Sequence, residues 1–269
     1  MTMTTAAYAR CLWGILWREG LRFVHQRERF VAALVRPLVW LVVFAAGFRA
    51  ALGISIIPPY ETYITYETYI VPGLVGMVQL FNGMQTSLSL VYDREVGSMR
   101  VLLTSPLPRW FLLVSKLIGG CAVSVLQVYV FLLAAWLFGV DLPLYGCIAL
   151  FPVLVLTGTM LGAFGLVLSS TIRQLENFAG VMNFVIFPMF FLSSALYPLW
   201  KIQETSTLLY RICSYNPFTH AVELIRFTLY LEWNGVAIAW TAGTLVLFLA
   251  IAIAAYDPKH GMVRGRGGA

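Results

Sequence analysis

The sequence predicts an all-α membrane protein with six transmembrane helices. Of its 269 residues, 60% are hydrophobic and only 11% are charged, whereas soluble domains carry roughly 45–50% apolar and about 25% charged residues. Six stretches are long enough, at about 20 residues, to cross a bilayer as helices and are nearly free of charge. A soluble globular protein is excluded, because so few charged side chains cannot cover a folded surface of this size.

The six expected spans follow one another with short connections. They cover residues 37–57, 68–92 and 117–140, and lie within 142–172, 177–200 and 233–256. Pro152 and Pro188 fall inside the fourth and fifth spans, where we expect kinks, because neighbouring helices can satisfy the freed carbonyl groups. The spans form one membrane domain, 37–256, which follows a cytoplasmic segment, 1–36, and precedes a basic tail, 257–269.

The positions of the charged residues predict the orientation. Of the 18 Lys and Arg residues, 14 lie in the N-terminal segment, the second and fourth connections and the tail, together with 6 of the 12 acidic residues. The opposite side has 4 basic and 6 acidic residues. Since basic residues mark the cytoplasmic side, both termini are expected in the cytoplasm. The basic excess is therefore a topology signal, and no nucleic-acid partner is expected.

The N-terminal segment, 1–36, is predicted to be an amphipathic helix. Its apolar and basic residues fall on separate helical faces, the first with Trp13, Trp17, Leu21 and Val24 and the second with Arg18, Arg22 and Arg29. Such a helix either lies in the cytoplasmic interface of the membrane or packs on the protein's own cytoplasmic face. The two interpretations are compatible and stay open.

The connection between the second and third spans is too charged to cross a membrane. Asp93, Arg94, Glu95 and Arg100 precede Pro106 and Pro108, so we expect a short cytoplasmic helix that begins near Tyr92 and is ended by the prolines, within 93–109. The alternative is a solvated loop whose arginines only follow the charge rule.

The segment before the last span, 201–232, is predicted to be an outer re-entrant hairpin. Asn216 followed by Pro217 is a helix-start signal. An apolar face follows at Phe218, Val222, Ile225 and Leu229, with Glu223, Arg226 and Tyr230 elsewhere, and residues 205–214 form a shorter helix before it. Neither piece can span alone, so the hairpin would enter the outer leaflet only where protein shields it. A plain extracellular loop is the alternative.

Polar residues inside the spans form a stripe. The members are Gln79, Asn82, Thr86 and Ser89 on the second span, and Ser124 and Gln127 on the third. Such groups face other helices or a translocation path, and both remain open. Gly158 and Gly162 predict a close helix contact. The repeat of tyrosines from Tyr60 to Tyr69 predicts an aromatic belt at the outer headgroups or a ring of substrate contacts.

No catalytic or metal constellation is expected. His25, His220 and His260 lie in separate segments, and none of the three lysines follows a phosphate-binding glycine loop, so the chain is not expected to be an ATPase. His220 and Glu223, three residues apart, are interpreted as a structural pair more than a catalytic dyad. The four cysteines have no metal-ligand spacing and are expected to be reduced.

Three patches resemble one family. These are Tyr69-Ile70-Val71-Pro72-Gly73-Leu74, then Arg94-Glu95 with Gly97-Ser98-Met99 and Leu102-Leu103-Thr104-Ser105-Pro106, and then Asn216-Pro217-Phe218-Thr219-His220-Ala221-Val222-Glu223 with Arg226. With the order of the segments, they resemble the permease of the ABC-2 type, or type V, ABC exporters over nearly the whole chain. One departure is Arg100, where members of the family often have an acidic residue.

The resemblance implies roles for three groups of residues. The first group, expected to couple to the ATPase, is Asp93, Arg94, Glu95, Gly97, Ser98, Met99 and Arg100. The second, expected along the translocation path, is Gln79, Asn82, Thr86, Ser89, Gln127 and Asn183. The third, expected in an outer gate, is Asn216, Pro217, Phe218, His220, Glu223 and Arg226.

The resemblance also implies a bacterial inner-membrane exporter of the drug, lipid and lipooligosaccharide kind. Its expected partners are two copies of a cytoplasmic ABC ATPase, which would bind ATP and Mg²⁺, a second permease that makes a homodimer, and membrane lipid. The chain itself is expected to bind no cofactor. The alternative is a stand-alone secondary carrier or membrane-embedded enzyme, although neither a mid-span acidic residue nor an inverted repeat is visible.

Overall fold

The computed structural model describes residues 5–25, 27–48, 58–60, 64–96, 108–172 and 174–255. Over these residues the regular structure is helical, which confirms the predicted all-α class for this part of the chain. The helices are α1 (Thr5–His25), α2 (Arg27–Phe48), α3 (Tyr66–Glu95), α5 (Arg109–Leu137), α6 (Leu144–Thr171), α7 (Leu175–Phe191), α8 (Leu199–Thr205), α9 (Thr207–Tyr215), α10 (Pro217–Leu229) and α11 (Gly235–Ala255).

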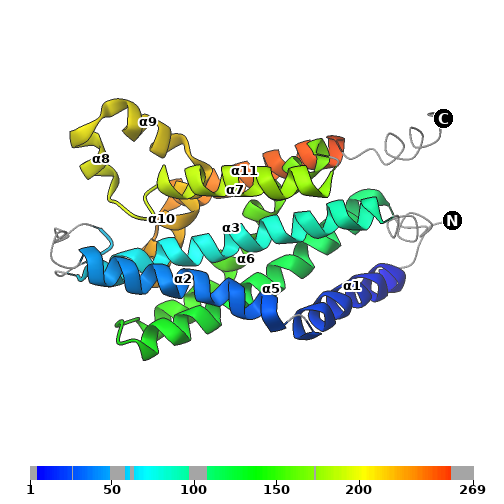
Figure 1. Cartoon of the computed structure of the whole chain (residues 1–269), viewed down its shortest axis with the longest axis horizontal. Coiled ribbons are helices and arrows are strands. Elements are labelled where there is room, and N and C mark those ends of the chain that lie inside the picture. The colour runs from blue at the N-terminus through cyan, green and yellow to red at the C-terminus, as the bar shows by residue number, and fades with distance from the viewer. Residues whose placement is uncertain are drawn as a thin grey trace.

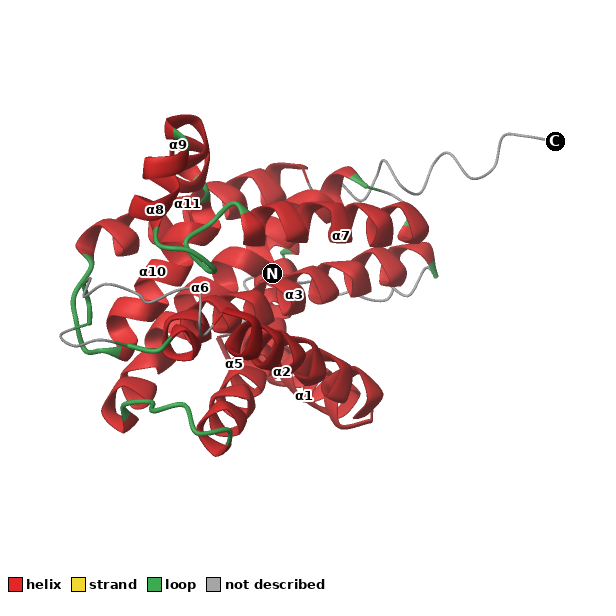
Figure 2. Cartoon of the chain, turned by 60° about the vertical axis from the view of Figure 1, so that its left-hand side comes forward, coloured by secondary structure: helices red, strands yellow, loops and turns green. Residues whose placement is uncertain are grey.

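Helix α3 occupies the centre of the bundle (Figures 1 and 2). Helices α2, α5, α6, α7 and α10 all pack against it, and 20 of its 30 residues are buried. A helix enclosed by protein can carry polar groups that bind neighbouring helices, so it need not be uniformly apolar. This location explains why α3 holds most of the polar stripe.

Within the described part of the chain, three helices are long and apolar enough to cross a membrane: α5 from Trp110, α6 and α11. Helix α7 and the middle of α2, Leu34–Val43, are shorter apolar helices. Both α6 and α7 continue through their internal prolines, Pro152 and Pro188, without a break.

The predicted boundary between the N-terminal segment and the first span is wrong. Helix α1 ends at His25, and α2 runs from Arg27 to Phe48, ten residues ahead of the expected start at Pro37. Pro37 lies inside α2 and is buried. A proline costs one backbone hydrogen bond inside a helix, which packing can offset. Residues 1–36 are therefore not one unit, and residues 49–57 lie outside the described part.

The two ends of the molecule differ (Figure 1). Helix α1, the C-terminal end of α3 and the C-terminal end of α11 lie together at one end, which we name the α1 end. Helices α8 and α9 lie at the other, the α8–α9 end. The described beginning and end of the chain thus share one end of the bundle.

The predicted close contact at Gly158 and Gly162 of α6 is confirmed. A Cβ atom built on Gly158 would lie 3.1 Å from Nε2 of Gln79, and one built on Gly83 of α3 would lie 2.9 Å from the Cα of Gly162. The backbones of α3 and α6 therefore touch where neither has a side chain, as small residues allow in membrane bundles.

Helix α1 packs on the bundle, as one of its two interpretations predicts, and its location in the membrane interface stays a prediction. Tyr8 packs edge-to-face on Phe111 of α5, with ring centroids 4.9 Å apart. Trp13 and Trp17, by contrast, are 67% and 60% exposed and stack on each other. One side of α1 thus packs on the bundle, and its tryptophans point away from it.

Candidate functional site

Only part of the expected coupling segment lies in the described residues. Asp93, Arg94 and Glu95 form the last turn of α3, which continues past Tyr92, so the expected helix start near Tyr92 is wrong. Gly97, Ser98, Met99 and Arg100 lie outside the described residues. The described chain resumes at Pro108, and α5 starts at Arg109.

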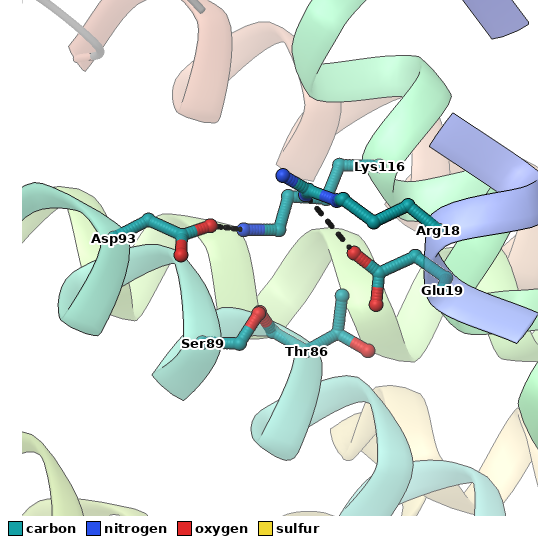
Figure 3. Close-up of polar contacts among 6 residues, drawn as sticks. All are labelled: Arg18, Glu19, Thr86, Ser89, Asp93 and Lys116. Carbon is teal, nitrogen blue, oxygen red and sulfur yellow. Dashed lines mark hydrogen bonds and ion pairs between the residues drawn. The ribbon is translucent and has the colours of Figure 1, made fainter. Parts of the chain in front are cut away.

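A buried ion pair joins the two helices on either side of this segment (Figure 3). Nζ of Lys116 on α5 donates to Oδ2 of Asp93 at 2.5 Å, and both side chains are at least 95% buried. A buried charge requires a partner, because leaving it alone in a low-dielectric environment is costly. The pair therefore fixes the end of α3 to the beginning of α5.

Helix α1 brings a second pair to the same place. Arg18 donates to Glu19 at 3.1 Å, and Figure 3 shows the two side chains beside Lys116. Glu19 also lies against α5, since a Cβ atom on Gly119 would be 3.2 Å from its Cγ. Helices α1, α3 and α5 thus meet in a cluster of four charged residues at the α1 end.

The structure brings together three residues of the polar stripe, and each binds another helix. Gln79 Nε2 donates to the Leu154 carbonyl oxygen of α6 at 2.7 Å, and Thr157 of α6 donates back to Gln79 Oε1 at 2.7 Å. The Asn82 amide donates to Oε1 of Gln127 on α5. These contacts favour the packing interpretation for Gln79, Asn82 and Gln127.

The other stripe residues and Asn183 are placed differently, and Ser124 is buried on α5. Thr86 and Ser89 donate to backbone carbonyl oxygens of their own helix, at 2.9 and 3.0 Å. Both lie on the turns of α3 that lead to Asp93 (Figure 3). Asn183 is exposed on α7 and does not lie among the residues on α3 and α5.

The predicted start and apolar face of α10 are confirmed. Asn216 caps the helix by accepting a hydrogen bond from the Phe218 N–H at 3.0 Å, with Pro217 in the first position. Its amide also donates to the carbonyl oxygens of Met189 and Leu192, at 2.8 and 2.7 Å. The buried face contains Phe218, Val222, Ile225 and Leu229. Asn216 thus ties α10 to the end of α7.

His220 and Glu223 do not act as the predicted pair, because each has another partner. His220 Nε2 donates to the Ser214 carbonyl oxygen at 2.8 Å, and its ring stacks on Trp240 of α11 with centroids 4.7 Å apart. Burial lowers the pKa of His220. Glu223 instead pairs with Arg226.

Arg226 corrects one expectation, and the tyrosines have partners that the sequence did not indicate. Arg226 was expected away from the apolar face, yet it is 2% exposed. Tyr66 and Tyr69 are buried, with hydroxyl groups that donate to the carbonyl oxygens of Leu196 and Ser194 in the turn after α7, each at 3.0 Å. Tyr60 is also buried, it packs on Tyr230 with ring centroids 4.7 Å apart, and desolvation raises its pKa to about 12. The aromatic belt and the ring of substrate contacts both stay predictions.

A family model described as ABC-2 type transporter matches residues 10–230 of this chain. The chain belongs to the ABC-2 type transporter family. The matched range includes the charged cluster at the α1 end, the polar stripe and helices α8, α9 and α10. The resemblance inferred from three short patches is confirmed.

Named relatives agree with this assignment. The probable multidrug ABC transporter permease YbhR of Escherichia coli (strain K12) is 30% identical over 186 residues, 68% of this chain and 49% of YbhR. The putative transport permease ycf38 of Cyanophora paradoxa is 28% identical over 229 residues, 84% of this chain and 76% of ycf38. The daunorubicin resistance ABC transporter permease protein DrrB1 of Streptomyces coeruleorubidus is 24% identical over 246 residues, 90% and 82% of the two chains. The match spans about half the length of YbhR.

The Pro-Gly patch of this ABC-2 permease has a packing reason in the structure. A Cβ atom on Gly73 of α3 would lie 2.5 Å from the Ala195 carbonyl oxygen, so only glycine lets the turn after α7 lie against α3. The same turn supplies the Ser194 and Leu196 carbonyl oxygens to Tyr69 and Tyr66.

Sequence reasoning missed the partners of the charged residues in this permease. Lys116 was visible as a single lysine at the head of an apolar helix, which is itself a signal for a buried partner. The partners are distant in the chain. Asp93 and Glu19 lie 23 and 97 residues before Lys116, and Ser194 lies 32 residues before Arg226. No local pattern indicates these contacts.

Proposed function

We propose that this chain is the membrane-spanning subunit of an ATP-driven exporter in the bacterial cytoplasmic membrane. In this proposal α2, α3, α5, α6, α7 and α11 cross the membrane, and α1 lies in the cytoplasmic interface. The outer hairpin of α8, α9 and α10 closes the far side. A homodimer of the chain works with two copies of a cytoplasmic ATP-binding subunit, which hold ATP and Mg²⁺.

The observation that carries the proposal is the ion pair between Asp93 and Lys116. The segment expected to contact the ATPase begins in the last turn of α3 and ends at α5, and this pair joins those two helices. A push on the segment would therefore move α3 and α5 together instead of spreading them. Since α3 packs on five other helices, its displacement would reach most of the bundle.

The substrate proposed is an amphipathic, drug-like or lipid-like molecule taken from the cytoplasm or the inner leaflet. Two relatives carry multidrug and daunorubicin resistance in their names, which supports a drug-like substrate. The polar stripe and Asn183 are proposed to line its path once the bundle opens. In the closed arrangement three of these residues bind one another or α6.

The first test is isolation of the tagged full chain from its native membranes in a mild detergent. We expect a cytoplasmic ATP-binding protein to co-purify, and ATP hydrolysis to be present in that complex but absent from the chain alone. A stand-alone carrier or membrane enzyme would purify without any such protein, and that result would overturn the proposal.

The second test addresses the coupling segment. We expect Glu95→Ala and Gly97→Pro to abolish export while the amount of chain in the membrane is unchanged. The matched control is Glu176→Ala, which removes an exposed glutamate from the first turn of α7, outside the segment. Normal export by both coupling variants would contradict the coupling role.

A further inference from the structure

Arg226 is a charged residue held on three sides inside the α8–α9 end. One terminal nitrogen, Nη2, donates to the Ser194 carbonyl oxygen at 2.8 Å, and the other, Nη1, donates to Glu223. The guanidinium carbon lies 4.1 Å from the centroid of the Tyr69 ring, the geometry of a cation–π contact. Arg226 therefore touches α10, α3 and the turn after α7 at once.

The Ser194 carbonyl oxygen is shared by two of these partners. It accepts a hydrogen bond from Tyr69 as well as the one from Arg226. Close by, a Cβ atom on Gly76 of α3 would lie 2.9 Å from Cγ2 of Val222, so the Val222 side chain packs on the α3 backbone in the same region. Separation of α10 from α3 must break the contact between Arg226 and the Tyr69 ring together with this packing.

A charged group suits a contact that opens and closes. In the closed arrangement the guanidinium is compensated by a carboxylate, a carbonyl oxygen and an aromatic ring, as a buried charge requires. If α10 moves away from α3, water can take over the solvation of the guanidinium, so the open arrangement is also stable for this side chain. A contact of this type favours two discrete arrangements over gradual deformation.

We propose that Arg226 is the positioning residue that locks the outer hairpin onto α3, and that this lock must release for the α8–α9 end to open. Its place in a transport cycle rests on the proposed function. The lock itself is a property of the chain alone and can be measured without any transport.

The experiment measures the labelling rate of a cysteine buried between α10 and α3. In a background with Cys11→Ser, Cys121→Ala, Cys147→Ser and Cys213→Ala, the reporter is Val222→Cys, at a fully buried position. The control reporter is Ala163→Cys, buried in a separate cluster with Leu113 and Leu117. The full chain is reconstituted in nanodiscs, where N-ethylmaleimide reaches both membrane faces.

Four substitutions separate the contacts of the lock. We expect Arg226→Gln to speed labelling of the Val222→Cys reporter at least roughly tenfold. The free-energy cost of breaking a buried ion pair exceeds the free energy that corresponds to a tenfold change in rate. Tyr69→Leu removes ring and hydroxyl and should have a similar effect. Tyr69→Phe keeps the ring and Arg226→Lys keeps the charge, so both should lie between wild type and Arg226→Gln.

Two results would overturn the lock. The first is an unchanged labelling rate at Val222→Cys in Arg226→Gln and Tyr69→Leu. The second is equal acceleration at both reporters, because that would show a general loosening of the bundle. If Arg226→Gln does not fold, Arg226→Lys provides the test. It retains the charge, and its labelling rate must still differ from that of the wild type.

A second arm tests release with the co-purified ATPase present. We expect ATP to speed labelling of the Val222→Cys reporter in the wild-type background, and labelling to be fast with or without ATP in Arg226→Gln. If Arg226 slows labelling of the reporter but ATP does not change the labelling rate, the lock is confirmed and its role in gating is rejected. If no ATPase co-purifies, the proposed function fails while the labelling of the chain alone still decides the lock.

Discussion

At the scale of single residues, the buried charges of this permease come as pairs. Asp93 binds Lys116 at the α1 end, and Glu223 binds Arg226 at the α8–α9 end. Each pair joins groups that would be costly in an apolar interior if either stood alone. The Asp93–Lys116 pair joins α3 to α5, whereas the Glu223–Arg226 pair lies within α10, where Arg226 also donates to the Ser194 carbonyl oxygen of the turn after α7.

The Asp93–Lys116 pair predicts an asymmetric effect of substitutions. Lys116→Met breaks the buried ion pair with Asp93, so we expect a loss of about 3–5 kcal/mol of stability. The double variant Asp93→Asn with Lys116→Met should recover part of this loss, because both charges are gone. The measurement is thermal unfolding of the purified chain in detergent.

Arg18→Gln serves as the control for that prediction. Its side chain is 42% exposed, so loss of its pair with Glu19 should change stability by less than about 1 kcal/mol. A double variant no more stable than Lys116→Met would show that the loss does not arise from the charge of the Asp93 carboxylate.

At the scale of helices, glycines decide how closely α3 approaches its neighbours. On the α6 side, a Cβ atom on Gly83 would meet backbone atoms of Gly162 and Leu161 at 2.9 to 3.0 Å, and backbone cannot move aside as a flexible side chain can. Gly73 likewise meets backbone atoms, those of Ala195 in the turn after α7, and Gly76 makes room for the side chains of Val222 and Phe218 on α10. The central position of α3 therefore depends on these small residues.

This packing predicts opposite effects for two Gly→Ala changes. Gly83→Ala should separate α3 from α6 and cost roughly 1–3 kcal/mol through overpacking. Gly243→Ala in α11 should be neutral or stabilise the chain by up to about 1 kcal/mol, because no atom of the described residues lies within 4 Å of its added Cβ.

Thermal unfolding of both variants, measured side by side, checks the prediction. Equal stability of the Gly83→Ala and Gly243→Ala chains would contradict the proposed close crossing of α3 and α6.

At the scale of the whole molecule, the basic residues predict its orientation in the membrane. The connection between α5 and α6 carries Asp141 and no basic residue, whereas the connection between α6 and α7 carries Arg173. The first is therefore expected outside and the second in the cytoplasm.

Reporter fusions test this orientation. We expect alkaline phosphatase to be active when fused after Asp141 and inactive after Gln174, two exposed positions on either side of α6. Green fluorescent protein should show the opposite behaviour. Activity of the phosphatase at both positions, or at neither, would show that α6 does not cross as expected.

Much of the fold was predictable because it depends on local patterns. The start of α10 follows from Asn216 and Pro217, and its buried face follows from four apolar residues at helical spacing. The start of α2 was not predictable, because Pro37 looks like a helix start and becomes an interior residue only through packing. The sequence predicted which residue types make up the candidate site, but not which residues contact one another there.

The sequence by itself determined that this is a helical membrane protein of the ABC-2 family, with a capped outer helix and a close glycine contact. These properties are encoded by composition and by residues within one or two helical turns of each other. Only the tertiary structure decided that Arg226, Tyr66 and Tyr69 are buried and that Asp93 binds Lys116. The physical reason is that burial of a polar group depends on what lies against it, and here those groups come from turns and helices distant in the chain.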